Sequence, residues 1–255
     1  AAGIDINDLS FAASTIDTTD LIITLNAGFD EIEVENQLGT NTAQYIDTLR
    51  FADGATASFD LYDGWVFGTA SGETLNGGST KDIILLGAGN DTSNGNDGDD
   101  ELFGGEGNDT LRGYGDNDIL VGGDGTDLLY GGDGNDFLYA GAGNLDRLEG
   151  GNGADTFVLA GDDALNGLNR IIDFDGTESD ALQLVDVLFG YDPVTSAIND
   201  FVTLTESGGN TNLYVDRDGA HETYTAQHVA RFEGVTGEWT DAADMLSQGE
   251  LAVVV

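Results

Sequence analysis

Apolar residues recur at every ninth position through the middle of the chain, from Gly68 to Val158. In every unit but one, the last three residues centre on one leucine, isoleucine or phenylalanine, and the first six are rich in glycine; the exception has Ser93 at the centre. Three residues are too few for a helix but suffice for a short strand, while the glycine-rich part favours a tight turn. The period of nine therefore predicts a parallel β-roll, in which two units make one coil and units n and n+2 stack on the same edge. At about 4.8 Å between neighbouring strands, ten units make a slab roughly 24 Å long.

The pattern changes on both sides of the repeats. Before them, short β-prone runs at 21–25, 31–35, 48–51 and 58–61 are separated by Asn-Ala-Gly and Ala-Asp-Gly turns. After them, longer apolar runs stand at 157–159, 170–174 and 182–185, and one helix is expected over 242–246, with Thr240 or Asp241 as its N-cap and Gly249 beyond its end. The predicted fold is all-β: an N-terminal β-rich module (1–67), a parallel β-roll (68–158) and a mostly-β C-terminal cap (159–255).

The net charge limits the classes of molecule that this chain can bind. The chain has 48 acidic and only 7 basic residues, a net charge of -41, so nucleic acids and anionic membranes are excluded as partners. No apolar run approaches the length of a membrane span, and the absence of cysteine excludes disulfides and thiolate metal sites. The start at Ala1-Ala2-Gly3 suggests a piece of a longer chain. A thin core and so many carboxylates need a multivalent cation before the repeats can compact.

The sixth position of the repeat supplies the carboxylates. Ca²⁺ takes 6–8 oxygen ligands, and two stacked turns can offer two carboxylates and several carbonyls. We expect each ion between aspartates of units n and n+2, and about five to seven ions in all. The predicted carboxylate ligands are Asp82, Asp91, Asp100, Asp109, Asp118, Asp127, Asp136, Asp146 and Asp155. The predicted carbonyl ligands are those of Gly87, Gly89, Gly98, Gly104, Gly105, Gly107, Gly122, Gly123, Gly125, Gly131, Gly132 and Gly134.

Some units depart from the pattern. Glu73 replaces aspartate in the first unit, and Thr80 and Lys81 replace small residues in the second, which weakens the sites at that end. Asp116 stands where glycine is expected, and an extra residue near Leu145 displaces Asp146. The alternative to a calcium-binding roll is a flexible acidic linker, but a linker needs neither this register nor an apolar residue at every ninth position.

The repeat, written GGxGxDxUx with U apolar, resembles the calcium-binding nonapeptide of RTX proteins. Residues 155–255 are similar to the domain that follows such repeats in large secreted RTX proteins and adhesins, and residues 20–63 resemble the haemolysin-type calcium-binding-related module found beside them. The resemblance implies an extracellular or cell-surface bacterial protein. It also implies export as an unfolded chain by the type I secretion machinery, led by an uncleaved C-terminal signal.

Enzyme chemistry finds no support in the sequence. His221 and His228 are the only histidines, and neither HExxH, GxSxG nor a P-loop occurs. Asp216-Arg217-Asp218-Gly219 begins like an EF-hand loop but lacks the later ligands, so a hairpin turn is favoured. Asp173 and Asp175 could add a peripheral calcium, although solvent exposure is the commoner fate of such residues.

Four aromatic residues have structural and functional alternatives. Tyr130 and Tyr139 could form a carbohydrate-binding strip, but a structural ladder of cross-strand aromatics is favoured. Trp65 and Trp239 could contact a ligand, but we expect them to be cap-core residues.

The sequence is best explained by a non-enzymatic, monomeric, calcium-dependent folding and export module of a large extracellular protein, an adhesin. Two alternatives stay open: the accessory module of a secreted enzyme or toxin, and a surface-layer or carbohydrate-binding module with a cell-surface ligand.

Overall fold

The computed structural model describes residues 64–143, 145–161, 167–188, 191–192, 196–219 and 225–254, together with five strand segments nearer the N-terminus. Those five strands form one antiparallel sheet in sequence order, as expected for a β-rich module. The predicted strand at 58–61 is represented by a strand that ends at Ser58, and residues 59–61 lie outside the described part. The strands are β1 (Leu9–Ala13), β2 (Leu21–Leu25), β3 (Glu31–Val34), β4 (Thr48–Phe51) and β5 (Thr56–Ser58).

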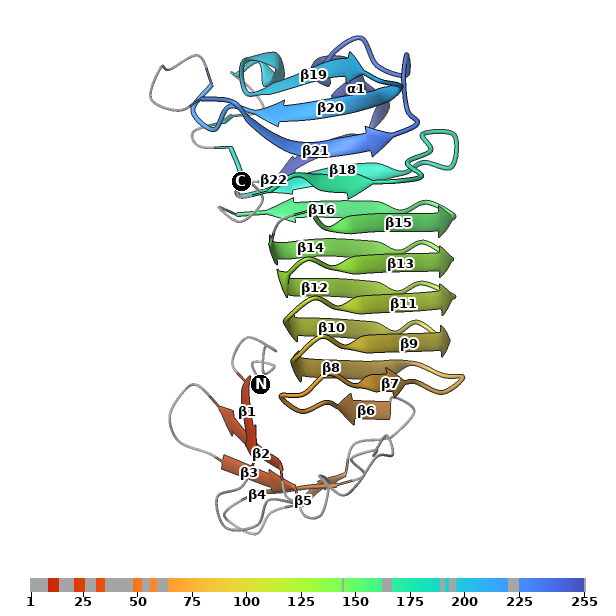
Figure 1. Ribbon diagram of the computed structural model, residues 1–255, viewed down its shortest axis with the longest axis vertical. Helices are drawn as coiled ribbons and strands as arrows, with labels where there is room; N and C mark the ends of the chain where they lie inside the picture. The colour runs from red at the N-terminus through yellow and green to blue at the C-terminus, as the bar shows by residue number, and fades with distance from the viewer. Residues whose placement is uncertain are drawn as a thin grey trace.

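From Gly64 onward the chain winds into a parallel β-roll of about five coils, which confirms the predicted fold (Figure 1). Successive strands alternate between two sheets. One sheet receives β6 (Gly64–Phe67), β8 (Asp82–Ala88), β10 (Glu101–Glu106), β12 (Ile119–Gly125), β14 (Phe137–Gly143) and β16 (Thr156–Ala160). The other receives β7 (Thr74–Asn76), β9 (Thr92–Asp97), β11 (Thr110–Gly115), β13 (Leu128–Asp133) and β15 (Arg147–Asn152).

The strand register follows the n, n+2 rule. Leu102 lies opposite Ile84 on one side and Leu120 on the other, and Leu111 is paired with Leu129 in the second sheet. Across the inserted residue the same alignment continues, since Leu129 lies opposite Leu148. Equivalent residues of alternate units therefore form continuous rows along the roll.

The strands are longer than the three residues expected. β10, for example, runs through the first three residues of the following unit, Gly104 to Glu106, of which Gly105 and Glu106 also pair with their neighbours in the sheet. Gly105, at position 2, has a positive φ of 102°, which glycine tolerates, so the chain can bend there and still pair, and the turn itself shortens to positions 4–6 of the repeat. This extension turns the first position of the repeat inward, as the burial of Gly104 shows.

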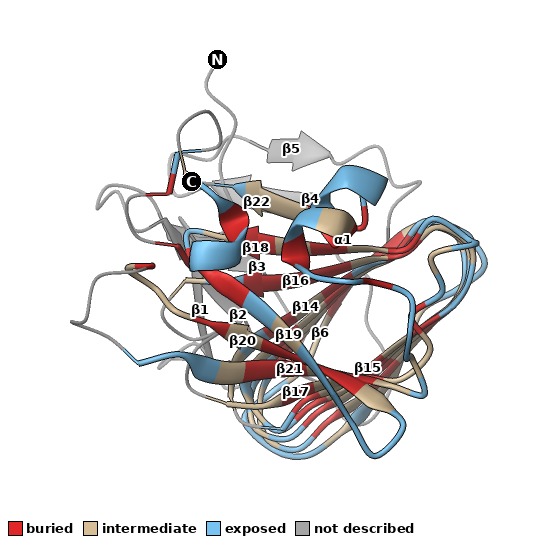
Figure 2. Cartoon of the chain, turned by 90° about the horizontal axis from the view of Figure 1, so that it is seen from above, coloured by how far each residue is buried: buried red, intermediate tan, exposed pale blue. Residues whose placement is uncertain are grey.

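The core is a single file of apolar side chains between the two sheets. Leu102, Leu111, Leu120, Leu129 and Leu138 have no exposed surface, and in the end-on view of Figure 2 buried and partly buried residues alternate along the strands of the roll. Each fully buried leucine contributes about 1.5–3 kcal/mol. One such residue per strand gives a thin core, as the composition of the repeats implies.

The cap continues both sheets of the roll. β18 (Ala181–Val185) pairs in parallel with β16, and β22 (Leu251–Val254) pairs with β18. In the second sheet β17 (Asn169–Ile171) follows β15, β21 (Gln227–Glu233) follows β17, and the hairpin of β20 (Asn210–Val215) and β19 (Val202–Ser207) completes the edge. A short 3-10 helix, η3 (Ile198–Asp200), precedes that hairpin. The limits predicted at 67/68 and 158/159 stay predictions, although β6 already belongs to a roll sheet.

An aromatic cluster closes the end of the core. Phe174 contacts Phe157 at a ring-centroid distance of 5.9 Å, and Phe232 and Trp239 edge-on at 5.1 and 5.4 Å. Trp239 is thus a cap-core residue as predicted, whereas the side chain of Trp65 lies outside the described part.

The predicted helix is α1 (Ala242–Gln248). Asp241 is its N-cap, accepting a hydrogen bond from Asp244 N, and Gly249 ends it in the left-handed conformation. No helix among the described residues is long and apolar enough to cross a membrane.

Candidate calcium-binding ladders

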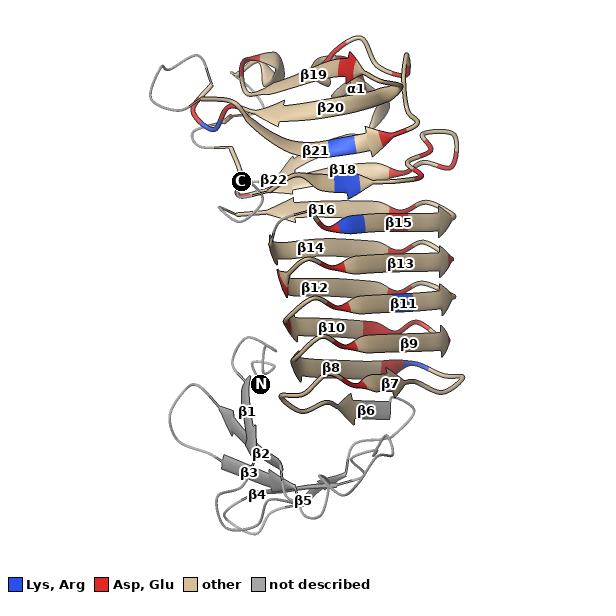
Figure 3. Cartoon of the chain, viewed as in Figure 1, with Lys and Arg blue, Asp and Glu red and all other residues tan. Residues whose placement is uncertain are grey.

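The nine predicted aspartates lie in two buried columns, one along each edge of the roll (Figure 3). Each residue comes at the start of a strand, where the turn delivers the chain to a sheet. We call the column that leads into the nine-stranded sheet the first ladder: Asp91, Asp109, Asp127 and Asp146. The column that leads into the eight-stranded sheet is the second ladder: Asp82, Asp100, Asp118, Asp136 and Asp155. None of the nine is more than 2% exposed.

Backbone hydrogen bonds tie each ladder together. The N–H of one aspartate donates to Oδ1 of the aspartate in the next coil, as from Asp100 to Asp118 and from Asp109 to Asp127, both at 2.8 Å. The inserted residue does not break the series, because Asp127 N donates to Asp146 Oδ1 at 2.9 Å. The predicted pairs therefore stand side by side in both ladders.

The second carboxylate oxygen of almost every rung has no hydrogen-bond partner. Buried oxygens without a donor are costly, and here they recur at one position of the repeat. These atoms are the Oδ2 atoms of Asp91, Asp100, Asp109, Asp118, Asp127, Asp136, Asp146 and Asp155. A row of buried, unpartnered carboxylate oxygens is the chemistry that a hard cation satisfies.

Glycine at the first position of the repeat makes room for these oxygens. A Cβ at Gly122 would lie 2.6 Å from Asp127 Oδ2 and 2.5 Å from the Ala140 carbonyl oxygen of the next coil. A Cβ at Gly77 would be equally close to Asp82 Oδ2 and to the Gly95 carbonyl. Carboxylate and carbonyl oxygens thus converge on a space that a side chain would fill.

The predicted glycine carbonyls lie in the stacked turns, most of them directly against the next coil. If the equivalent glycine of a neighbouring coil carried a Cβ, that atom would collide with the carbonyl oxygen of the predicted ligand. This holds for the carbonyls of Gly87, Gly89, Gly105, Gly107, Gly122, Gly123, Gly125, Gly131, Gly132 and Gly134. Gly98 lies against the backbone of Thr80 and Lys81, and Gly104 faces Asp109 Oδ2 and Gly122 O. Their role as calcium ligands stays a prediction.

Burial makes the charged form of the ladder aspartates costly. From Asp91 to Asp155, desolvation raises the pKa of each ladder aspartate, hydrogen bonds from backbone N–H groups oppose this rise, and for most of these rungs neighbouring carboxylates add to it. The pKa of Asp118 rises to about 8, and those of Asp100 and Asp127 to about 7. The pKa values of Asp136, Asp146 and Asp155 rise to about 6. A bound cation would reverse this balance, because it stabilises the ionised carboxylates.

The units that depart from the repeat pattern have local structural explanations. Glu73 turns its longer carboxylate onto its own turn, where it accepts from Thr69 N at 2.8 Å, and Asp82 Oδ2 accepts from Gly78 N. The first rungs are thus closed by N–H groups. Asp116 takes the left-handed conformation otherwise held by glycine (φ 70°) and accepts from Gly98 N, and Leu145 absorbs the insertion with φ 71°.

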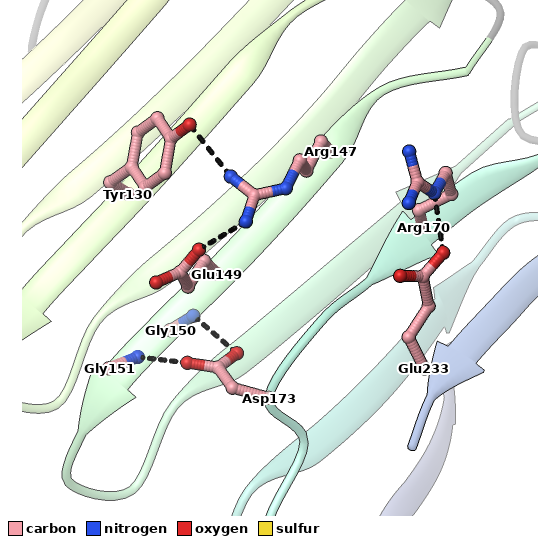
Figure 4. A network of polar contacts seen from close by, with 8 residues as sticks. All are labelled: Tyr130, Arg147, Glu149, Gly150, Gly151, Arg170, Asp173 and Glu233. Carbon is pink, nitrogen blue, oxygen red and sulfur yellow. Dashed lines mark hydrogen bonds and ion pairs between the residues drawn. The ribbon is translucent and has the colours of Figure 1, made fainter. Parts of the chain in front are cut away.

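The nonapeptide pattern did not account for three residues at the end of the roll, of which two extend the ladders. Asp180 precedes β18 and accepts from Asp155 N at 2.9 Å, so it continues the second ladder beyond the repeats. Asn169 begins β17 and continues the first ladder. Asp173 accepts from Gly150 N and Gly151 N, which corrects the expectation of a solvent-facing residue (Figure 4). An aspartate or asparagine two residues before an apolar one (Asp180-Ala-Leu, Asn169-Arg-Ile) was the available signal.

A second set of side-chain ladders was also missed. At the fifth position of the repeat, the backbone N–H of one coil donates to the side-chain Oδ1 of the coil before it, as from Asn117 to Asp99 and from Asn135 to Asn117, both at 2.9 Å. These bonds run in the opposite direction to those of the aspartates. Each coil is thus held by both of its neighbours.

The predicted ladder of aromatics is wrong. Tyr130 lies in the nine-stranded sheet and Tyr139 in the eight-stranded one, because residues nine apart fall on opposite faces of the roll. The ring of Tyr130 lies instead between Arg112 and Arg147, at 5.4 and 5.2 Å from their guanidinium carbons. Arg147 also donates to the Tyr130 hydroxyl and to Glu149 (Figure 4).

The Asp216–Gly219 segment is a turn, as favoured. Gly219 N donates to the Asp216 carbonyl, and Gly219 has φ 64°, between the antiparallel strands β20 and β21. Asp175 accepts from the backbone N–H and hydroxyl of Thr177. Among the described residues, no three His, Asp or Glu side chains gather into a metal site, and the ladders bring carboxylates together two at a time.

Comparison with known proteins agrees with this geometry. Five overlapping stretches match the RTX calcium-binding nonapeptide repeat: residues 67–101, 94–129, 112–144, 130–163 and 145–169. Residues 20–58 match the haemolysin-type calcium binding protein related domain. A search of curated proteins found no match.

Several solved structures are similar to this chain, among them a lipase and a subunit of an epimerase. One is the AlgE6R3 subunit of the mannuronan C5-epimerase from Azotobacter vinelandii, 26% identical, with a TM-score of 0.40, covering 58% of this chain and 78% of the subunit. The other is the extracellular lipase LipA from Serratia marcescens, 16% identical, with a TM-score of 0.32; the match covers 74% of this chain and 40% of the lipase.

Stacked turns, buried aspartate ladders and the repeat matches together define a calcium-binding repeat module built as a parallel β-roll. Its repeats are RTX calcium-binding nonapeptides, which are typical of extracellular, secreted bacterial proteins.

Proposed function

We propose that this chain is a non-enzymatic module that folds on calcium after export and belongs to a larger extracellular protein, an adhesin. The observation that carries the proposal is the row of eight buried carboxylate oxygens without a donor. In a calcium-poor cytosol these carboxylates would repel one another, and the chain would stay extended. In millimolar calcium outside the cell, ions between the rungs would close the turns. The aspartates of the two ladders and the glycine carbonyls beside them would hold about five to seven ions.

The proposed route of export is a type I secretion machinery, with an uncleaved signal in the last few dozen residues. A passenger protein fused to residues 200–255 and co-expressed with such a machinery should appear in the medium uncleaved. The same passenger fused to residues 68–158 is the control and should stay inside. Export of the control, or retention of the first fusion, would contradict the placement of the signal.

An accessory role beside an upstream enzyme is the second candidate, favoured by the similarity of this chain to a subunit of an epimerase and to a lipase. Sequencing the parent upstream of residue 1 separates the two. A catalytic signature there would favour the accessory role, and long tandem repeats of a surface protein would favour the adhesin.

A further inference from the structure

The first ladder does not end with the last nonapeptide. β17 pairs in parallel with β15, so that Arg170 lies opposite Arg147 and Ile171 opposite Leu148. Asn169 therefore stands one rung beyond Asp146. The backbone confirms the alignment, because Arg170 N donates to the Asp146 carbonyl at 2.8 Å, as Arg147 N does to the Asp127 carbonyl at 2.9 Å.

The side chain of Asn169 shares the unusual property of the rungs. It is only 2% exposed, and its Oδ1 atom has no hydrogen-bond partner. Asp146, the rung before it, is 1% exposed and has an unpartnered Oδ2. An amide oxygen and a carboxylate oxygen are both calcium ligands, and here they are neighbours in a buried row.

The second ladder ends differently. Its last rung, Asp180, accepts from Asp155 N at 2.9 Å through Oδ1 and from Asp175 N at 2.8 Å through Oδ2. Both oxygens of Asp180 are thus satisfied by backbone N–H groups. One ladder is closed by the protein itself, and the other ends on an oxygen that the protein leaves without a donor.

We propose that Asp146 and Asn169 form an additional calcium site at the junction of the roll and the cap, outside the nonapeptide motif. The proposal rests on the calcium-binding function proposed above. The pair brings one negative charge, where two stacked aspartates bring two, and Arg147 and Arg170 directly follow the two ligands in sequence. Since calcium affinity rises with the charge of its ligands, this site is the weakest of the array and fills last.

Native mass spectrometry of the full chain across a calcium titration tests the proposal by counting ions. Asn169→Ala should bind one ion fewer than the wild type. Asn212→Ala is the matched control, because Asn212 is also a buried cap asparagine (4% exposed), but it accepts from Arg231 Nε and donates to the Thr205 carbonyl. The control should bind the full number of ions.

Asn169→Asp adds a carboxylate without removing volume, so it covers the case in which Asn169→Ala fails to fold. It should bind the full number of ions and take up the last one at a calcium concentration about tenfold lower. A full count in Asn169→Ala, or an unchanged last step in Asn169→Asp, would overturn the additional site and leave the ladder sites standing. A wild-type chain that binds no calcium would overturn the proposed function itself.

Discussion

At the scale of single residues, the repeat places carboxylates inside the protein. Aspartate at the sixth position turns one oxygen to a backbone N–H and leaves the other buried without a donor. Glycine at the first position leaves the space into which that second oxygen fits. The glycine at the first position and the aspartate at the sixth position therefore depend on each other, because a side chain at the glycine would occupy the space of the aspartate oxygen.

Replacement of Gly122 by alanine tests this dependence. Its Cβ would come within 2.6 Å of Asp127 Oδ2 and 2.5 Å of the Ala140 carbonyl, so Gly122→Ala should lower the free energy of unfolding in saturating calcium by about 1–3 kcal/mol. Gly115→Ala is the control, since its Cβ would meet its nearest neighbours at an ordinary 3.9 Å, and it should change stability by no more than about 0.5 kcal/mol. Urea unfolding of the two variants measures the difference, and equal losses would contradict the proposed packing.

The raised pKa values predict opposite pH dependences with and without calcium. Since burial raises the pKa of Asp118 to about 8 and those of Asp100 and Asp127 to about 7, the calcium-free fold binds more protons than the unfolded chain. Its stability is therefore greatest below the unfolded pKa of about 4 and falls as pH rises toward 8. With calcium the carboxylates must ionise to bind, so calcium-linked stability should fall on acidification.

Thermal unfolding in millimolar calcium between pH 4 and pH 8 measures one slope, and the β-content of the metal-free chain, read by circular dichroism over the same pH range, measures the other. A calcium-free chain that became more stable as pH rose through this range would show that the rungs are not buried as described.

Residue-level prediction succeeded where a motif repeats and failed where it does not. All nine aspartates could be placed from the sequence because each recurs in register with the repeat, and all but Asp91, which is followed by Ser93, have an apolar residue two positions later. Asp180 and Asn169 hold the same structural position, but the residues before them do not follow the glycine pattern. The position of Asp173 was not predicted because its contacts to Gly150 and Gly151 join segments that the repeat does not relate.

At the scale of elements, alternation between the two sheets decides which residues can interact. It makes Asp100, Asp118 and Asp136 neighbours and separates Tyr130 from Tyr139. The n, n+2 rule was sufficient to predict the first result and should have excluded the proposed aromatic ladder. The length of the strands was not predictable from apolar positions alone, because the residues that extend them are glycines.

Because each inner rung lies between two others, loss of its charge should weaken two sites together. Asp118→Asn should raise the calcium midpoint of folding at least several-fold, since ligand charge sets calcium affinity. Asp124→Asn, which removes the same charge from an exposed position on the following turn, should leave the midpoint nearly unchanged. The midpoints are read from calcium titrations of both variants by circular dichroism. Similar shifts would mean that the register of ligands proposed here is wrong.

At the scale of the whole molecule, the cap extends the roll rather than merely adjoining it. β18 and β22 continue one sheet, β17 and β21 continue the other, and an aromatic cluster around Phe174 fills the end between them. The sequence predicted a mostly-β cap with one helix, but its parallel register with the roll depends on long-range pairing that no local pattern records. Charge acts against this packing, because residues 68–158 carry 18 acidic and only 3 basic residues.

The central claim is that calcium is required for this chain to hold its roll. Far-UV circular dichroism of the purified chain in chelator, then in millimolar Ca²⁺ and separately in Mg²⁺, tests it most directly. We expect a largely disordered spectrum in chelator, a β-rich spectrum in Ca²⁺, and little change in Mg²⁺, which prefers a small octahedral shell and keeps its water. A β-rich spectrum in chelator that calcium leaves unchanged would contradict the account.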